Sequence, residues 1–282
     1  MVESRWRPSA KVYNGRWNPG SKIEFVRDAI EQLPPGGMLV VLDVTWGEYE
    51  HLLGKLADRP GVRVTFDQGR LQAVSPLRAH EHYAQVMADM ALIAAETLDL
   101  PFEQLGSTTL RQLERQRGVE PDRCFYIANA GRIAGKTTLD LIADPPPDIV
   151  VEIDMSSDSQ AKLPIYASLG VPEIWLYDGQ RVRILELRDD SGSYIEILES
   201  KFLECLTTAV LDRYLELSKT TGQSEVRRAF RAWLPATMAS PCSEGPVRRA
   251  ACSRPPPRRQ PSPYPRCPAL ATPTGEICCG PD

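Results

Sequence analysis

The sequence contains few histidines and no long apolar run, and each shortage excludes a class of protein. The only histidines are His51, His80 and His82, and no Cys/His cluster has the ligand spacing of a zinc site. No apolar run approaches the roughly 20 residues needed to cross a bilayer, so no membrane partner is expected. There is no Gly-x-Ser-x-Gly elbow, the turn on which many hydrolases carry their nucleophile.

Cysteine is also sparse in the part of the chain that has a globular composition. Of the seven cysteines, only Cys124 and Cys205 lie in the first 240 residues. A disulfide framework would spread through the folded region, so we expect these two to be reduced thiols. The N-terminal residues lack the apolar stretch of a secretory signal, which favours a cytoplasmic location. The net charge of -4 argues against a surface coated in positive charge.

The remaining composition predicts one α/β domain with an extension at each end. Hydrophobic residues make up 42% of the chain and charged residues 25%, as in globular proteins. We expect residues 1–37 to be a poorly defined N-terminal extension and residues 38–234 to form a mixed central sheet flanked by helices. Residues 235–282 hold twelve of the 25 prolines and show little apolar periodicity. Such a segment buries too little surface to offset the entropy of ordering, which predicts a disordered Pro/Arg-rich tail.

The hydrophobic pattern predicts alternating strands and helices. The β-branched run Ile149–Ile153 is typical of a buried central strand. The alternation of Val62, Val64 and Phe66 with polar residues is typical of a half-buried strand. Predicted strands cover residues 38–44, 62–66, 71–74, 107–113, 122–128, 149–153, 173–177, 182–187 and 194–198. Predicted helices cover residues 23–33, 46–56 (capped by Thr45), 164–169, 208–218 and 224–234, and the clearest helix opens at Ser75-Pro76.

Acidic side chains accompany two of the predicted strands. Asp122 opens the strand at 122–128, and Glu152 lies inside the run at 149–153. Because strand side chains alternate between faces, Asp148, Glu152 and Asp154 share one face. An acidic row in a buried strand is costly unless something compensates it, and a divalent cation would do so. We therefore predict a metal site at Glu152, with Asp148 as a rival to Asp122 for the second carboxylate.

A lysine at the start of the next element could complete this site. Lys162 follows Glu152 by ten residues and could turn back toward the carboxylates, where it would orient a water or stabilise phosphate charge. Two carboxylates, a backbone carbonyl and a lysine around Mg²⁺ can hydrolyse a phosphodiester. In the competing interpretation, the acidic residues face water and Lys162 is solvated. Tyr166, four residues further on, is interpreted as a core or rim residue.

Several separate motifs, in the same order along the chain, resemble those of one known family. They are Gly106–Thr109, Glu120–Ile127, Asp144–Asp148 and Gly170–Trp175. From about residue 38 to 234 the chain resembles the Uma-two type putative restriction endonuclease family. The resemblance implies a restriction-endonuclease-like α/β core that carries a PD-(D/E)XK site.

The resemblance also implies roles for individual residues. Asp122 matches the first acidic residue of the motif and Glu152 the second, so both would ligate Mg²⁺ or Mn²⁺, together with the backbone carbonyl of Ile153. Asp154 stands where the simplest pattern has its lysine, so Lys162 would be a lysine that has migrated to the following helix.

Two neighbouring residues are candidates for an accessory role. His80 or Glu81 would supply the additional polar group that this superfamily often carries on its first core helix. Asp148 and Asp154 remain accessory candidates because they share a strand face with Glu152.

The predicted function is therefore a Mg²⁺- or Mn²⁺-dependent endonuclease that hydrolyses phosphodiester bonds in nucleic acid, with DNA favoured over RNA. One alternative is a catalytically inactive homologue that binds nucleic acid or a protein partner. Another is a structural or regulatory module without a metal. Homodimerisation is left open by the sequence.

Overall fold

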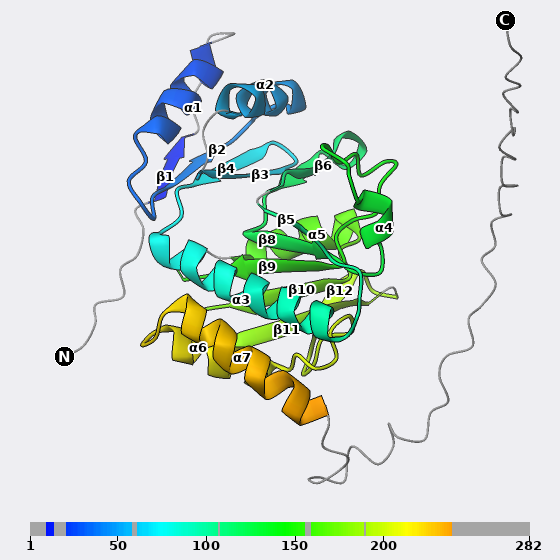
Figure 1. Cartoon of the computed structure of the whole chain (residues 1–282). Helices are drawn as coiled ribbons and strands as arrows, with labels where there is room; N and C mark the ends of the chain where they lie inside the picture. Colours follow the sequence, from blue (N-terminus) through cyan, green and yellow to red (C-terminus); the bar gives the residue numbers. More distant parts are fainter. Residues whose placement is uncertain are drawn as a thin grey trace, which may run out of the picture. The chain divides into compact units, whose positions relative to one another are not determined.

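A computed structural model describes residues 10–13, 21–57, 61–106, 108–155, 159–188 and 190–238. All of them belong to one unit, residues 1–239, whose strands form two sheets (Figure 1). Part of the predicted N-terminal extension contributes regular elements to this unit, namely β1 (Ala10–Tyr13) and α1 (Ser21–Glu31). The final helix α7 (Gln223–Met238) continues four residues past the predicted boundary at 234. The rest of the predicted tail lies outside the described residues.

The first sheet is mixed and has a helical layer on one face. In spatial order it contains β1, β2 (Met38–Val41), β4 (Arg70–Val74), β3 (Arg63–Asp67), β7 (Arg117–Val119) and β6 (Leu110–Gln112). β1 and β2 are parallel, and the other pairs are antiparallel. Gln68 and Gly69 join β3 to β4 with φ angles of 48° and 98°, as a two-residue hairpin loop with two positive φ angles requires. α1 and α2 (Trp46–Leu56) pack on this sheet in one hydrophobic cluster.

The cap of α2 was predicted from the sequence and is confirmed. The Thr45 side chain accepts a hydrogen bond from the backbone N–H of Glu48, whose carboxylate accepts one from the backbone N–H of Thr45. This reciprocal pair satisfies two N–H groups that a helix start leaves without partners.

The second sheet contains β12 (Ser193–Ile197), β11 (Val182–Arg188), β10 (Glu173–Tyr177), β9 (Ile149–Ile153), β8 (Arg123–Tyr126) and β5 (Glu103–Leu105), in that spatial order. β9 and β10 are parallel, and the connection between them passes through η2 (Ser159–Lys162) and α5 (Leu163–Leu169). All five residues of β9 are buried, so the predicted central strand is confirmed.

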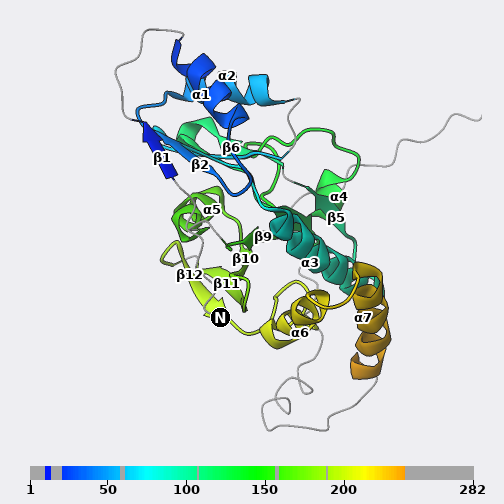
Figure 2. The ribbon, with the colours of Figure 1, turned by 90° about the vertical axis from the view of Figure 1, so that its left-hand side faces the viewer.

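Helices cover both faces of the second sheet (Figure 2). Alternate residues of β9, including Val151 and Ile153, pack with α3 (Arg78–Thr97), α6 (Thr208–Ser218) and α7. Val150 packs on the opposite side with Ile165 and Tyr166 of α5. The predicted α/β class, with mixed sheets flanked by helices, is confirmed. The strands are divided between two sheets where the sequence predicted one.

The polar side of β3 differs from the sequence prediction. The alternation around Val64 predicted a strand with one solvent-exposed face, but Arg63 and Thr65 are both only 7% exposed. Tertiary contacts explain the difference, because Arg63 lies against acidic side chains from α3 and from the start of β8. Among the described helices, none combines the length and the apolar character needed to span a membrane.

Packing at Gly118 gives a first test of the structure. A Cβ atom at Gly118 in β7 would overlap the hydroxyl group of Tyr49 and lie 2.8 Å from its ring carbon Cζ. Gly118→Ala should therefore lower the free energy of unfolding by about 1–3 kcal/mol, the usual cost of overpacking a core. The matched control is Gly106→Ala, whose Cβ would meet nothing within 4 Å. Urea denaturation compares the two, and an equal effect of both substitutions would contradict the packing described here.

Candidate active site

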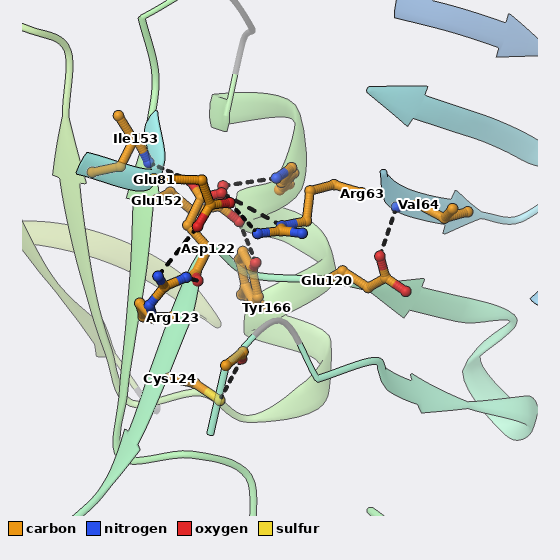
Figure 3. A network of polar contacts seen from close by, with 12 residues as sticks. Arg63, Val64, Glu81, Glu120, Asp122, Arg123, Cys124, Glu152, Ile153 and Tyr166 are labelled. Carbon is orange, nitrogen blue, oxygen red and sulfur yellow. Dashed lines mark hydrogen bonds and ion pairs between the residues drawn. The ribbon is translucent and has the colours of Figure 1, made fainter. Parts of the chain in front are cut away.

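The chain crosses from the first sheet to the second at Glu120-Pro121-Asp122, between β7 and β8. The Glu120 carboxylate accepts hydrogen bonds from the backbone N–H of Val64, at 3.0 Å, and from Thr109 Oγ1, at 2.8 Å. Asp122 Oδ2 accepts the backbone N–H of Ile153 at 2.8 Å (Figure 3). Each carboxylate thus satisfies a strand N–H group in a different sheet, and a buried N–H group without a partner would be costly. These two contacts fix the crossover and with it the position of Asp122.

The pairing of β8 with β9 brings the two predicted metal ligands close together. β8 and β9 are antiparallel, and Arg123 pairs with Val151. Asp122 directly precedes β8, and it accepts a hydrogen bond from Ile153, the residue that follows Glu152 in β9. Asp122 is 6% exposed and Glu152 is 2% exposed. Burial raises the pKa of Glu152 and the charge of Asp122 adds to that effect, so two carboxylates this close require positive charge nearby.

Lys162 supplies part of that charge. Its Nζ atom donates to Glu152 Oε2 at 2.7 Å, and Lys162 is itself only 9% exposed. Burial lowers the pKa of Lys162, but the charges of Glu152 and Asp122 outweigh burial and raise it overall. Burial raises the pKa of Glu152, and the ammonium group of Lys162 opposes that shift. The structure thus brings Asp122, Glu152 and Lys162 together, and the lysine comes from the end of η2.

Tyr166 belongs to the same cluster, although its sequence context suggested a core or rim position. Its hydroxyl group donates to Glu152 Oε1, so both carboxylate oxygens of Glu152 are engaged. Burial, together with the charge of Glu152, raises the pKa of Tyr166 and keeps the phenol protonated. A signal was available, since residues four apart share one face of a helix and Tyr166 follows Lys162 by four.

Arg63 is a second residue whose contribution the sequence did not reveal. Its Nη2 atom lies 2.7 Å from Glu81 Oε1, and its Nε atom lies 3.7 Å from Asp122 Oδ1. Arg123 approaches Glu81 Oε2 at 3.2 Å and donates to the backbone carbonyl of Asp122 at 2.6 Å. Glu81 therefore holds two arginines beside Asp122, one from each sheet.

His80 also lies within this charged cluster. It is 3% exposed and belongs to the first turn of α3. Burial lowers the pKa of His80, Lys162 and Arg63 lower it further, and Asp122 and Glu81 oppose the shift. The imidazole is therefore neutral near pH 7.

The remaining predicted residues are placed differently. Asp148 precedes the opposite end of β9, where its carboxylate accepts hydrogen bonds from the backbone of Ile127 and from the backbone and side chain of Asn129. The backbone N–H of Asp154 donates to Tyr177 in β10.

The N–H and C=O groups of one residue in an extended strand point to the same side. The N–H group of Ile153 donates to Asp122, so the carbonyl of Ile153 also faces the side of β9 on which Asp122 lies.

The donor set decides which ion could fit here. Within the described ranges, no group of three or more His, Cys, Asp or Glu side chains is arranged to hold a metal. Asp122 and Glu152 offer two carboxylates, and the carbonyl of Ile153 offers a third oxygen. Mg²⁺ prefers oxygen ligands and is usually held by one or two carboxylates while keeping several waters. The residues present therefore fit a hard divalent cation and do not resemble a closed structural site.

Comparison with known proteins gives one family. The family model described as Uma2, "Putative restriction endonuclease", matches residues 46–217, which is more than half of the chain. No curated protein matches the sequence.

The solved structures that are similar to the chain include two nucleases. A putative nuclease belonging to DUF820 from Anabaena variabilis is 15% identical, with a TM-score of 0.39, over 54% of this chain and 90% of that one. The type IIG restriction endonuclease BpuSI is 12% identical, with a TM-score of 0.28, over 57% of this chain and 17% of that one. At these scores the assignment rests on the family model alone.

The buried ion pair generates a prediction about stability. Lys162→Met should lower the free energy of unfolding by about 3–5 kcal/mol, because it leaves the buried Glu152 carboxylate without its cation. The double variant Glu152→Gln/Lys162→Met should recover most of that loss. Chemical denaturation of the two single variants and the double variant measures the coupling.

The matched control is the pair Lys201–Glu186 nearer the surface, whose lysine and glutamate side chains are 58% and 15% exposed. Lys201→Met should cost no more than about 1 kcal/mol, as is usual for surface pairs. Equal costs for Lys162→Met and Lys201→Met would show that the buried pair does not stabilise the fold as described.

Proposed function

Because the chain belongs to the Uma2 family of putative restriction endonucleases, we propose that it is a metal-dependent endonuclease that hydrolyses phosphodiester bonds in nucleic acid, with DNA as the favoured substrate. One observation carries the proposal. Two buried carboxylates lie close together, Asp122 against the backbone of Ile153 and Glu152 in the preceding position, and Lys162 contacts Glu152.

Asp122, Glu152 and the carbonyl of Ile153 would hold the Mg²⁺ or Mn²⁺ ion. When bound, such an ion lowers the pKa of a coordinated water and neutralises charge on phosphate oxygens. The protein contributes the fixed positions of the two carboxylates, one held by the Ile153 N–H group and the other by Lys162 and Tyr166.

Lys162 would act on the reacting phosphate or on the attacking water. Its raised pKa keeps it an ammonium group, which has three N–H donors. One donor is directed to Glu152, which leaves others for a phosphate oxygen or a water beside the carboxylates. A positive group preorganised in a buried site stabilises the charge that develops in the transition state.

Tyr166 would act indirectly, by fixing the orientation of Glu152. Outer partners of a metal ligand keep it oriented, and their loss typically costs about 10–100-fold in affinity or activity.

The other candidate function is a nuclease-fold module that binds nucleic acid without cleaving it. Lys162 and Tyr166 favour this second candidate in one respect, since together they engage both oxygens of Glu152.

A cleavage assay separates the two candidates. Plasmid DNA, linear DNA and RNA are incubated with the full chain and Mg²⁺ or Mn²⁺, and again with EDTA. Asp122→Asn and Glu152→Gln should each reduce cleavage by more than about 100-fold, and Tyr166→Phe should reduce it less, by about 10–100-fold. The matched control Glu96→Gln, which removes an exposed carboxylate of α3, should cleave like the parent protein.

The contrary results are equally definite. Cleavage that persists in both Asp122→Asn and Glu152→Gln, or that proceeds fully in EDTA, would exclude this site as its source. Absence of cleavage on every substrate, with nucleic-acid binding intact, would favour the binding module.

A further inference from the structure

A surface pocket of about 590 Å³ opens beside the carboxylate pair. Its walls come from β3, the beginning of α3, the end of β5 and the start of β8. The polar side chains that line it are Arg63, Arg78, Arg123, Glu81, Gln85 and Gln104. Arg63 connects the pocket to the site described above, because it also lies 3.7 Å from Asp122.

The pocket carries an excess of positive charge. Three guanidinium groups and one carboxylate line it, and that carboxylate, Glu81, is already shared between Arg63 and Arg123. Arg78 is exposed and forms no ion pair with any residue that the structure describes. Because the whole chain has a net charge of -4, this local excess marks a place suited to an anion.

One buried donor in the pocket wall also lacks an acceptor. Arg63 is more than nine-tenths buried, and its Nε atom has no hydrogen-bond partner in the described structure. A buried donor without an acceptor carries a free-energy cost, and the positive charge at Arg63 is therefore poorly neutralised. The Asp122 carboxylate attracts the guanidinium group, but at 3.7 Å it lies beyond hydrogen-bond distance.

The start of α3 adds to the attraction for anions. This helix has 20 residues, and its N-cap residue Leu77 provides no side-chain acceptor for the N–H groups of the first turn. Leu77 and Arg78 both line the pocket, so the positive end of the helix dipole lies at its wall. Exposed N–H groups at a helix start bind phosphate groups in many proteins.

We propose that this pocket binds a backbone phosphate of the nucleic-acid substrate, next to the phosphodiester that reaches Asp122 and Glu152. The proposal rests on the proposed nuclease function for the identity of the polymer. Arginine matches phosphate because its planar fork of N–H donors can contact two oxygens at once. DNA and RNA share this backbone group, so the pocket itself selects a phosphate and not a base.

Arg78 provides the sharpest test, because it is exposed and forms no ion pair with Asp122, Glu152 or any other described residue. The full chain is titrated in EDTA against short fluorescein-labelled DNA and RNA duplexes of equal sequence, and fluorescence anisotropy is recorded at several KCl concentrations. Arg78→Gln should weaken binding several-fold and reduce the slope of log K against log[KCl] by about 1. The duplex, DNA or RNA, that the parent protein binds and that Arg78→Gln binds more weakly identifies the polymer.

Arg228→Gln is the matched control, since Arg228 is exposed on α7 and forms no ion pair within the described residues. It should bind like the parent protein. The proposal is overturned if Arg78→Gln binds both duplexes with unchanged affinity and salt slope. It is overturned as well if Arg228→Gln loses as much affinity as Arg78→Gln, or if the parent chain binds neither duplex.

Failure of this proposal can be distinguished from failure of the nuclease proposal. Glu152→Gln should retain duplex binding in EDTA, because Glu152 does not line the pocket. If Arg78→Gln loses duplex binding and the parent protein shows no cleavage, the pocket proposal is supported and the nuclease proposal is refuted. If cleavage depends on Glu152 and Arg78→Gln binds as tightly as the parent protein, the nuclease proposal is supported and the pocket proposal is refuted.

Discussion

The repulsion between two buried carboxylates determines how this part of the molecule is built. Asp122 lies just before β8 and Glu152 inside the adjacent strand β9, and each is surrounded by groups that reduce the cost of its charge. Glu152 is in contact with Lys162 and Tyr166, while Asp122 accepts the N–H group of Ile153 and lies near a guanidinium group. Charges this deeply buried persist only when they are paired and hydrogen-bonded. A fold with no use for the pair would be simpler with apolar residues there, since replacing buried ionic groups by apolar ones is often neutral or stabilising.

The carboxylate pair lies where the two sheets meet, and both contribute to it. The Glu120-Pro121-Asp122 crossover leaves the first sheet and enters the second, and its two carboxylates hold one strand of each through backbone N–H groups. Arg63 comes from the first sheet and Glu152 from the second (Figure 3). Glu81 on α3 links the two layers by binding Arg63 and Arg123 together. The phosphate pocket that we propose lies beside this junction, and Arg63 both lines it and lies near Asp122.

Much of the fold and of the candidate site could be predicted from the sequence, because the strongest signals are local. A β-branched run identifies β9 and hence the buried position of Glu152, and ten residues are enough for Lys162 to return to it. The division into two sheets and the position of Arg63 depend on contacts between segments far apart in the sequence, which alternation within one strand cannot reveal. The same limit applies to residues 1–37, because β1 and α1 gain their order from pairing with β2 and packing against α2. Asp148 was a candidate because it shares a strand face with Glu152, but a shared face does not fix the distance between two residues along the strand. Its carboxylate instead accepts the N–H group of Ile127.

Asp122 and Glu152 are proposed to bind a divalent cation, and calorimetric titration of the protein with Mn²⁺ measures that binding. We expect saturable binding of a single ion by the full chain, lost in both Asp122→Asn and Glu152→Gln and retained in Asp148→Asn. Both substitutions of the carboxylate pair exchange a carboxylate for an amide of similar size, so the packing around each position is preserved. Absence of Mn²⁺ binding by the parent protein, or binding that is unchanged in both variants of the pair, would contradict this proposal.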